Sequence, residues 1–358
     1  MVDYLKRRDS LRKILANNAQ SAVFLDPISI RYLSGFSGSN AALVIGEEVD
    51  VDLLLTDSRY TQRAKDESPD IEIEINGEFI KLIHKRLQDK SVKQIAVDPL
   101  LMNISQGEAI ADEGKFELIK MKNVLTPLRS IKDEYEIAQI RKACAITAET
   151  LWFLINDLRP GMNERQISNL LQDGFLKRGA DGLAFASIVA SGVNSATPHH
   201  EPSKRIIEKG DMITIDCGAL LNGYHADMTR TIFIGSCADW QKDIYNLVME
   251  SQAAGRKKLV TGAVAEDVDE ASRKVIRDAD YGDFFVHSTG HGVGLEIHEP
   301  VFIAKGVKTK LSTGSCITVE PGIYLPGKGG VRIEDTCLVS EGDAEVLTTG
   351  SHEIICVA

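Results

Sequence analysis

The stretch Gly210-Asp-Met-Ile-Thr-Ile-Asp216 decides the expected fold, because a second stretch, Gly314-Ser-Cys-Ile-Thr-Val-Glu320, repeats its pattern of G-x-x-I-T-[IV]-[DE]. Each stretch is predicted to be an apolar strand that ends on a carboxylate. A further acidic residue follows each of them, Asp227 after 11 residues and Glu334 after 14 residues. Such a repeat indicates a duplicated half-domain, although the match is short enough to arise by coincidence. If the two halves face one another, the four carboxylates come together.

The first acidic pair lies in a predicted hairpin with a turn at Asn222 and Gly223. Depending on whether Asn222 opens or closes the two-residue loop, Asp216 pairs with Thr229 or with Asp227. Both registers place the two carboxylates on the same face of the hairpin. Because like charges side by side destabilise a hairpin, we expect a cation between them rather than two unrelated acids that face solvent.

A nitrogen ligand is predicted in the glycine-rich segment Ser288-Thr-Gly-His-Gly-Val-Gly-Leu-Glu-Ile-His298. Three glycines within five residues would let the backbone approach a ligand closely, and the lysine that a phosphate-binding loop requires is absent. Within this segment, His291 is the candidate ligand and His298 has a second role. Four carboxylates balance two divalent ions, and carboxylates with one imidazole suit Mn²⁺, Co²⁺, Zn²⁺ or Fe²⁺. Such an ion pair can activate water at neutral pH.

The composition bounds the other classes of function. The chain has 358 residues, of which 43% are hydrophobic and 26% charged, and these proportions are typical of a globular protein. Its formal net charge of −11 disfavours nucleic acid and anionic membranes as partners. No apolar run approaches the roughly 20 residues of a membrane span, and Met1–Ser10 lacks the apolar core of a signal peptide. Six scattered cysteines without a C-x-x-C pair indicate a reducing compartment. We therefore expect a soluble, cytoplasmic protein.

Two domains are expected. Residues 1–125 alternate helix and strand patterns, which predicts an α/β domain. Residues 126–358 begin with a long predicted helix that starts at Ser130, with Asp133 in an approximate capping box. Beyond Gly182, strands and glycine or proline turns dominate, so the second domain is expected to be α+β.

The five candidate ligands occur in the order Asp, Asp, His, Glu, Glu, at spacings of 11, 64, 29 and 14 residues. This order, together with G-H-G-V-G-L-E-I-H-E, T-V-E-P-G-I-Y and G-V-R-I-E-D, resembles the pita-bread metallopeptidases, which include aminopeptidase P, prolidase and methionine aminopeptidase. The segments Tyr32–Ser39 and Thr56–Tyr60 look like the N-terminal domain of the proline-specific members. The resemblance implies an α+β protein in which a smaller creatinase-like α/β domain precedes a pita-bread domain of two pseudo-symmetric halves.

By this resemblance, the metal site holds two divalent ions, with Mn²⁺ the first choice and Co²⁺ or Zn²⁺ in second place. Asp216 would hold one ion, and Asp227 and Glu334 would bridge both. His291 and Glu320 would hold the second ion. Glu320 would also orient the water or act as general base.

The resemblance also implies three residues beside the metals. His199 matches a substrate-binding histidine, and His298 matches a histidine that stabilises the developing oxyanion. Arg332 would support Glu334 and the substrate. His200, next to His199, does not fit the family pattern and receives no role.

The substrate class divides into two readings. Archaeal-type prolidases carry an arginine eleven residues after the metal-binding histidine, where it holds the carboxylate of a dipeptide, and this chain has Phe302 there. That departure favours a Xaa-Pro aminopeptidase, which acts on peptides with proline at the second position, over a Xaa-Pro dipeptidase. A homodimer is also expected from the resemblance.

The same fold also occurs in methionine aminopeptidases, in creatinase-like hydrolases and in non-catalytic binding modules. Methionine aminopeptidases usually lack the N-terminal domain. Creatinase-type members and the binding modules lack metal ligands, so the intact set of five argues against both.

Overall fold

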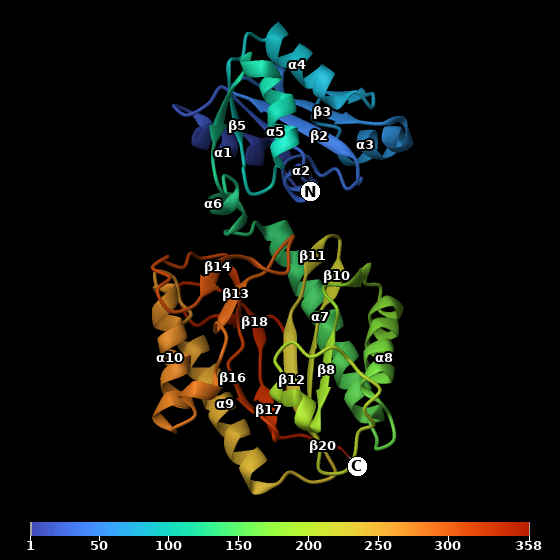
Figure 1. Ribbon diagram of the computed structural model, residues 1–358, viewed down its shortest axis with the longest axis vertical. Helices are drawn as coiled ribbons and strands as arrows, with labels where there is room; N and C mark the ends of the chain where they lie inside the picture. Colours follow the sequence, from blue (N-terminus) through green and yellow to red (C-terminus); the bar gives the residue numbers. More distant parts are fainter. Residues whose placement is uncertain (1, 358) are drawn as a thin grey trace. The chain divides into compact units, whose positions relative to one another are not determined.

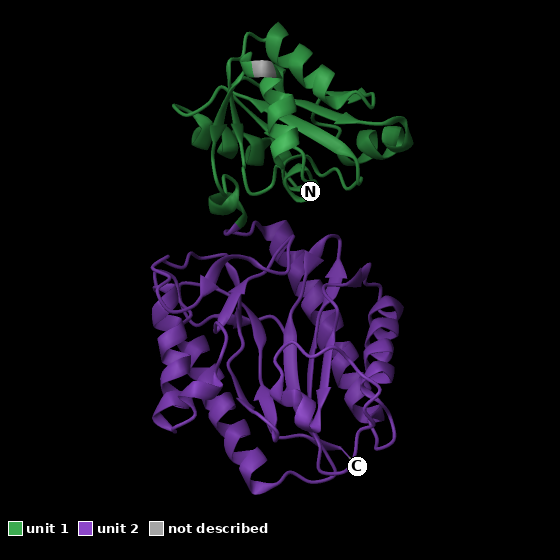
Figure 2. Cartoon of the chain, viewed as in Figure 1, with its two compact units in different colours: residues 1–129 green, residues 130–358 purple. Residues whose placement is uncertain are grey.

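The computed structural model describes residues 2–357 and divides into two compact units, residues 1–129 and residues 130–358 (Figure 2). The observed boundary lies four residues beyond the expected one. The short helix α6 (Thr126–Arg129) belongs to the first unit because it contacts helix α1 (Tyr4–Leu15). Each unit has a hydrophobic core of its own.

The first unit is a six-stranded mixed sheet with helices around it (Figure 1), in the strand order β4-β3-β2-β1-β5-β6. Its alternation of helices and strands matches the α/β pattern of the sequence. The strands are β1 (Ser21–Phe24), β2 (Ala41–Gly46), β3 (Leu53–Thr56), β4 (Ile73–Ile75), β5 (Gln94–Val97) and β6 (Glu117–Lys120). The other helices are α2 (Pro27–Ser34), α3 (Thr61–Glu67), α4 (Phe79–Asp89) and α5 (Ile104–Ala111).

The second unit contains two pairs of long helices, one pair in each half. The helices are α7 (Glu134–Asp157), α8 (Glu164–Lys177), α9 (Asp239–Lys258) and α10 (Ala265–Asp278). Helix α7 starts at Glu134 rather than at Ser130, because Asp133 is its N-cap and forms the capping box with Glu136. Figure 1 shows the strands of this unit lying between the α7–α8 pair and the α9–α10 pair.

The repeated stretches occupy matching interior positions in two sheets, one with the order β20-β12-β9-β8 and one with the order β14-β13-β15-β18-β19. In each sheet the repeat forms one antiparallel pair, β9 with β12 and β15 with β18. Two small sheets, β11-β10-β7 and β16-β17, complete the unit. The strands are β7 (Gly182–Leu183), β8 (Ile188–Ser191), β9 (Met212–Cys217), β10 (Ala219–Leu221), β11 (Tyr224–His225), β12 (Met228–Ile234), β13 (Gly290–Gly292), β14 (Glu299–Ile303), β15 (Cys316–Val319), β16 (Gly322–Leu325), β17 (Gly329–Arg332), β18 (Asp335–Leu338), β19 (Glu345–Val346) and β20 (Cys356–Val357).

The hairpin of the first half has the register in which Asn222 opens the loop, so Asp216 lies opposite Thr229. Asn222 and Gly223 both have positive φ angles, 49° and 78°, as a tight two-residue hairpin loop requires. Asp227 lies just before β12, beyond the end of the ladder. The acidic residues are therefore presented where the strands of the repeat begin or end.

The glycines around His291 allow strands to pack closely, which differs from the ligand approach that the sequence suggested. A Cβ atom on Gly290 would lie 1.9 Å from the carbonyl oxygen of Thr318 in β15. On Gly292 or Gly294 it would lie 2.8 Å or 2.6 Å from oxygens of Glu299. Larger residues would therefore push β13 away from its neighbours.

The described residues include no helix long and apolar enough to cross a bilayer.

Candidate metal centre

Three of the candidate ligands form one buried cluster. A ligand atom of each of Asp227, His291 and Glu334 lies within 4.8 Å of the others. The Nε2 atom of His291 is 3.6 Å from Asp227 Oδ2 and 3.4 Å from Glu320 Oε1, which adds Glu320 to the group. These residues come from both halves, because Asp227 precedes β12 whereas Glu334 precedes β18.

Asp216 is also connected to the site through Arg332 and Thr229. Arg332 donates from Nη2 to Asp216 Oδ2 at 2.8 Å and from Nε to the hydroxyl of Thr229 at 3.1 Å. The same hydroxyl donates to Glu334 Oε2 at 2.7 Å. Strand β17 ends at Arg332 and β18 begins at Asp335, and both Arg332 and Glu334 contact the same threonine. Arg332 therefore couples the carboxylates of the two halves.

Burial and crowding make these acids hard to ionise together without a cation. Burial, followed by the charge of Glu334 and then of Asp216, raises the pKa of Asp227 well above its usual value. The pKa of Glu334 is raised well above its usual value by burial and by the charge of Glu320. Burial also raises the pKa of Glu320 to about 8, against the lowering effect of Arg332. Each carboxylate would titrate at a lower pH beside a divalent ion.

The donor atoms fit a divalent ion. Asp216 Oδ1, Asp227 Oδ1 and Glu334 Oε1 are buried and accept no hydrogen bond from any described side chain or backbone group. Burial lowers the pKa of His291 to about 4, so its ring is neutral. Its Nδ1 lies 3.0 Å from the carbonyl oxygen of Gly292, which assigns the proton to Nδ1 and leaves the Nε2 lone pair facing the carboxylates. Buried oxygen and nitrogen acceptors that face only one another need a cation between them. A metal-binding histidine commonly donates its other ring N–H to a backbone carbonyl, as His291 does here.

A cavity of about 540 Å³ lies over the carboxylates within the second unit. The candidates His199, His298 and Arg332 all line it, as does Phe302. The ring of His298 packs edge-on against that of His291, with centroids 4.3 Å apart. The other lining residues are Phe185, Ala186, Ser187, Ile188, Pro198, His200, Glu201, Pro202, Asp216, Asp227, His287, Ser288, His291, Ile297 and Glu320.

The sequence interpretation missed His287 and Tyr324, which extend the contacts of Arg332. Tyr324 receives a hydrogen bond from Arg332 Nη1, and its hydroxyl lies 2.8 Å from His287 Nε2. His287 Nδ1 lies 2.8 Å from the carbonyl oxygen of Ser288, so Nδ1 carries the proton and Nε2 accepts from Tyr324. Burial and the charge of Arg332 lower the pKa of His287 to about 4. The only available signal was the tyrosine inside T-V-E-P-G-I-Y.

Glu164, the first residue of α8, was also missed. It accounts for His200, whose side chain binds this carboxylate. Its Oε1 accepts from the backbone and hydroxyl of Ser191 and from the amide of Asn194 at 2.7–3.0 Å. Its Oε2 accepts from His200 Nε2 and from the backbone and hydroxyl of Ser203 at 2.6–2.9 Å. Burial raises the pKa of this fully buried carboxylate, but the hydrogen bonds outweigh it and lower the pKa to about 2. Glu164 therefore anchors both ends of the loop 191–203, of which residues 198–202 line the cavity.

A duplicated α+β domain in which buried carboxylates surround the imidazole of His291 beside a cavity defines a metal-dependent hydrolase as the class of protein. Residues 138–341 match the model of metallopeptidase family M24, and residues 7–131 match the creatinase/prolidase N-terminal domain. The chain belongs to metallopeptidase family M24. The expected creatinase-like domain followed by a pita-bread domain is thereby confirmed, as is a metallopeptidase activity. The family implies a divalent metal ion.

Relatives align over nearly the whole chain. A Xaa-Pro dipeptidase of Pyrococcus furiosus is 36% identical over 354 residues, which cover 98% of this chain and 99% of the relative. Among solved structures, a Xaa-Pro dipeptidase from Bacillus anthracis is 34% identical, with a TM-score of 0.96 and coverage of 99% of this chain and all of the other. An X-Pro aminopeptidase from Thermotoga maritima is 36% identical, with a TM-score of 0.91 and coverage of 98% and 100%.

Proposed function

We propose that this protein is a Xaa-Pro dipeptidase that hydrolyses dipeptides with a C-terminal proline and holds two divalent ions, Mn²⁺ by preference. The observation that carries the proposal is the set of buried carboxylate oxygens without hydrogen-bond donors on Asp216, Asp227 and Glu334, of which Asp216 and Asp227 line the cavity. The names of the Pyrococcus and Bacillus relatives support a dipeptidase over the aminopeptidase that we expected from the sequence.

The residues that would hold the ions are Asp216, Asp227, His291, Glu320 and Glu334. Two divalent ions held by these residues would balance the four acidic charges. When bound, divalent ions supply Lewis acidity toward the peptide carbonyl and a water nucleophile at neutral pH. Mn²⁺ suits a site of four carboxylates and a single imidazole.

The surrounding side chains would carry out the proton and substrate steps. Glu320, at the edge of the cluster, would accept the proton of the attacking water. His298 would donate a hydrogen bond to the oxygen that becomes negative in the transition state. His199, on the exposed wall of the cavity, would contact the substrate. Arg332 would hold Asp216 in place, because its guanidinium donates to that carboxylate.

A Xaa-Pro aminopeptidase is the second candidate, and Phe302 favours it. This side chain lines the cavity and is 45% exposed. Among the described residues that line the cavity, the single guanidinium is that of Arg332, which already binds Asp216 and Tyr324. The cavity therefore presents no free guanidinium for the carboxylate of a dipeptide, whereas a longer peptide has an amide at that point.

The discriminating experiment compares kcat/KM for Ala-Pro and Ala-Pro-Ala after the metal-free protein is loaded with Mn²⁺ or with Co²⁺. A dipeptidase should hydrolyse the dipeptide at least about tenfold more efficiently, which corresponds to about 1.4 kcal/mol of transition-state discrimination. The reverse ratio would establish the aminopeptidase. If neither peptide is cleaved with either metal, both candidates are wrong.

Three measurements complete the test. A Phe302→Arg variant, matched against Phe302→Leu, should move the ratio toward the dipeptide if this position faces the substrate carboxylate. Metal analysis of the loaded protein should find two ions per chain. Light scattering should give the mass of a homodimer, which we include in the proposal.

A further inference from the structure

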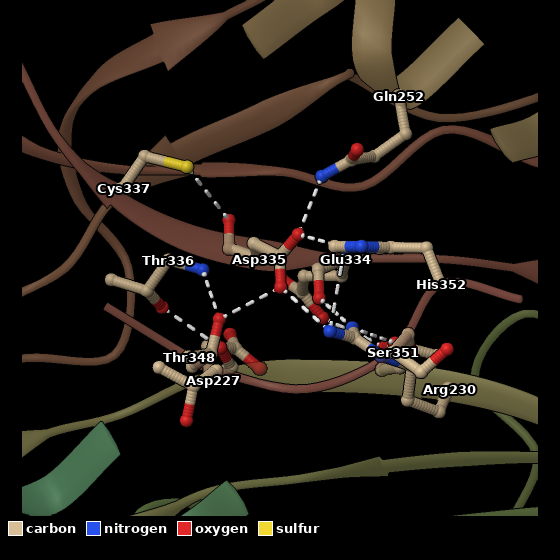
Figure 3. A network of polar contacts seen from close by, with 12 residues as sticks. Asp227, Arg230, Gln252, Glu334, Asp335, Thr336, Cys337, Thr348, Ser351 and His352 are labelled. Atoms are coloured by element: carbon tan, nitrogen blue, oxygen red, sulfur yellow. Dashed lines mark hydrogen bonds and ion pairs between the residues drawn. The ribbon is translucent and has the colours of Figure 1, made fainter. Parts of the chain in front are cut away.

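Behind the candidate metal ligands lies a second polar cluster, built around Asp335 (Figure 3). Glu334 faces the metal site, and its neighbour Asp335 faces the opposite side, as successive residues of extended chain do. Asp335 is completely buried, yet its two carboxylate oxygens have four side-chain donors. These donors are Arg230 Nη2 and Thr348 Oγ1 on Oδ1, and Gln252 Nε2 and His352 Nε2 on Oδ2.

Arg230 joins this cluster to the metal-binding strands. Its side chain is 1% exposed and pairs with Asp335 at 2.8 Å. From Nη1 it donates to the carbonyl oxygens of Thr229 and Glu334, at 2.9 Å and 2.6 Å. One guanidinium therefore binds the backbone of both halves, at Thr229 in β12 and at Glu334, a proposed metal ligand. Because a guanidinium is planar, these contacts restrict the strands in direction as well as in distance.

Asp227, the other proposed bridging ligand, is connected to Asp335 through Thr336 and Thr348. The hydroxyl of Thr336 donates to the carbonyl oxygen of Asp227 at 2.8 Å. The backbone NH of Thr336 donates to the Thr348 hydroxyl at 3.1 Å, and that hydroxyl donates to Asp335 at 3.0 Å. The carbonyl group of Glu334 is thus connected to Asp335 through Arg230, and that of Asp227 through Thr336 and Thr348.

The C-terminal segment closes this cluster toward solvent. His352 lies 2.6 Å from Asp335, and its side chain is 23% exposed. Arg230 Nε donates to the carbonyl oxygen of Ser351 at 3.2 Å, and the Tyr245 hydroxyl donates to that of His352 at 3.1 Å. The segment is therefore attached to the back of the metal site from two directions.

We propose that Arg230, Asp335 and His352 are positioning residues for metal binding, which hold the carboxylates of Asp227 and Glu334 at the separation that the ions require. The inference rests on the metal site of the proposed function and is independent of the peptide substrate. A buried ion pair adds little to stability compared with apolar side chains of the same volume, so its contribution here is to geometry. Partners behind metal ligands commonly change metal affinity by 10- to 100-fold.

The test uses His352→Ala, because this residue lies at the solvent-exposed edge of the cluster and its loss leaves the Arg230–Asp335 pair intact. Glu353→Gln is the matched control, since it changes the next residue, whose side chain is exposed and outside the cluster. Metal-free protein is titrated with Co²⁺ by calorimetry, and the visible absorption of the bound Co²⁺ reports its coordination. We expect about tenfold weaker Co²⁺ binding and an altered spectrum for His352→Ala, and no change for the control. KM at saturating Co²⁺ should stay the same.

Asp335→Asn provides a second and larger perturbation, because it removes the charge that pairs with Arg230. We expect a 10- to 100-fold loss of Co²⁺ affinity in the folded variant, and Asp335→Glu should recover part of it. If Asp335→Asn does not fold, His352→Ala decides the question. Co²⁺ affinities within twofold of wild type, together with an unchanged spectrum, would overturn the inference while leaving the proposed function intact. Failure of the wild-type protein to bind Co²⁺ would instead overturn the metal site and this inference with it.

Discussion

Removing the metal ions should make the stability of the protein fall as the pH rises, because of Glu320. Its pKa in the folded, metal-free protein is about 8, against an ordinary value of 4.5. Between these two values the folded chain keeps a proton that the unfolded chain loses. The folded state therefore binds more protons, and the free energy of unfolding decreases with increasing pH. The stabilisation by the proton is complete below pH 4.5 and is lost as the pH passes through 8.

The size of the effect follows from these two pKa values. One pKa unit corresponds to 1.36 kcal/mol, so Glu320 alone should lower the free energy of unfolding by about 2 kcal/mol between pH 6.5 and pH 8. For a domain of this size, that corresponds to a fall in Tm of about 4–8 °C. The pKa values of Asp227 and Glu334 are also raised, and both add to the fall.

Buried histidines have the opposite sign, which determines the useful pH window. His287 and His291 have pKa values of about 4 in the folded protein, against 6.5 ordinarily. Their neutral folded forms make stability rise with pH between 4 and 6.5, and each still adds about 0.4 kcal/mol to that rise between pH 6.5 and pH 8. Between pH 6.5 and pH 8 the carboxylates and these histidines therefore act in opposite directions, and comparison with a Glu320 variant separates the part due to Glu320.

The assay is thermal unfolding in EDTA across this window, compared with protein saturated in Mn²⁺. Wild-type protein in EDTA should show the fall in Tm, and bound Mn²⁺ should abolish most of it. The variant Glu320→Gln in EDTA should have a flatter profile than wild type. The same slope in Glu320→Gln and in wild type would show that Glu320 is not the group responsible, and the reasoning from its burial would fail.

Three further predictions concern individual side chains. Asp227→Asn or Glu334→Gln should abolish metal binding and activity, because each removes a carboxylate proposed to bridge the ions; metal analysis and peptide hydrolysis check this, and full activity in either variant would refute the site. His298→Ala should keep its metal but lose about 10²-fold or more in kcat, as expected for one oxyanion donor; loss of metal would mean that its role is assigned wrongly. Glu164→Gln should raise KM several-fold with little change in metal content, because it loosens the loop that carries His199; a changed metal content with normal KM would contradict that role.

Several features of the fold could be predicted from local patterns alone. The repeated strands and the glycine-rich histidine segment indicated two halves with acidic strand ends, and the order of the five candidate ligands indicated the family. Capping and turn residues were also informative, although helix α7 begins at Glu134, four residues after the predicted start at Ser130, because Asp133 is the N-cap itself. Such patterns involve residues that are close together in the chain, so they can be recognised without knowledge of the tertiary packing.

The partners of the polar side chains could not be predicted in this way. Arg332 binds Asp216 across 116 residues, Arg230 binds Asp335 across 105, and Glu164 collects donors from a loop up to 39 residues away. Hydrophobic periodicity identifies which face of a strand is buried, but two halves can pack in many ways that bury the same faces. The sequence by itself determined the kinds of ligand and their order along the chain. The tertiary structure decided which carboxylates share a site and which side chains hold them there, because those contacts form only when the two halves meet.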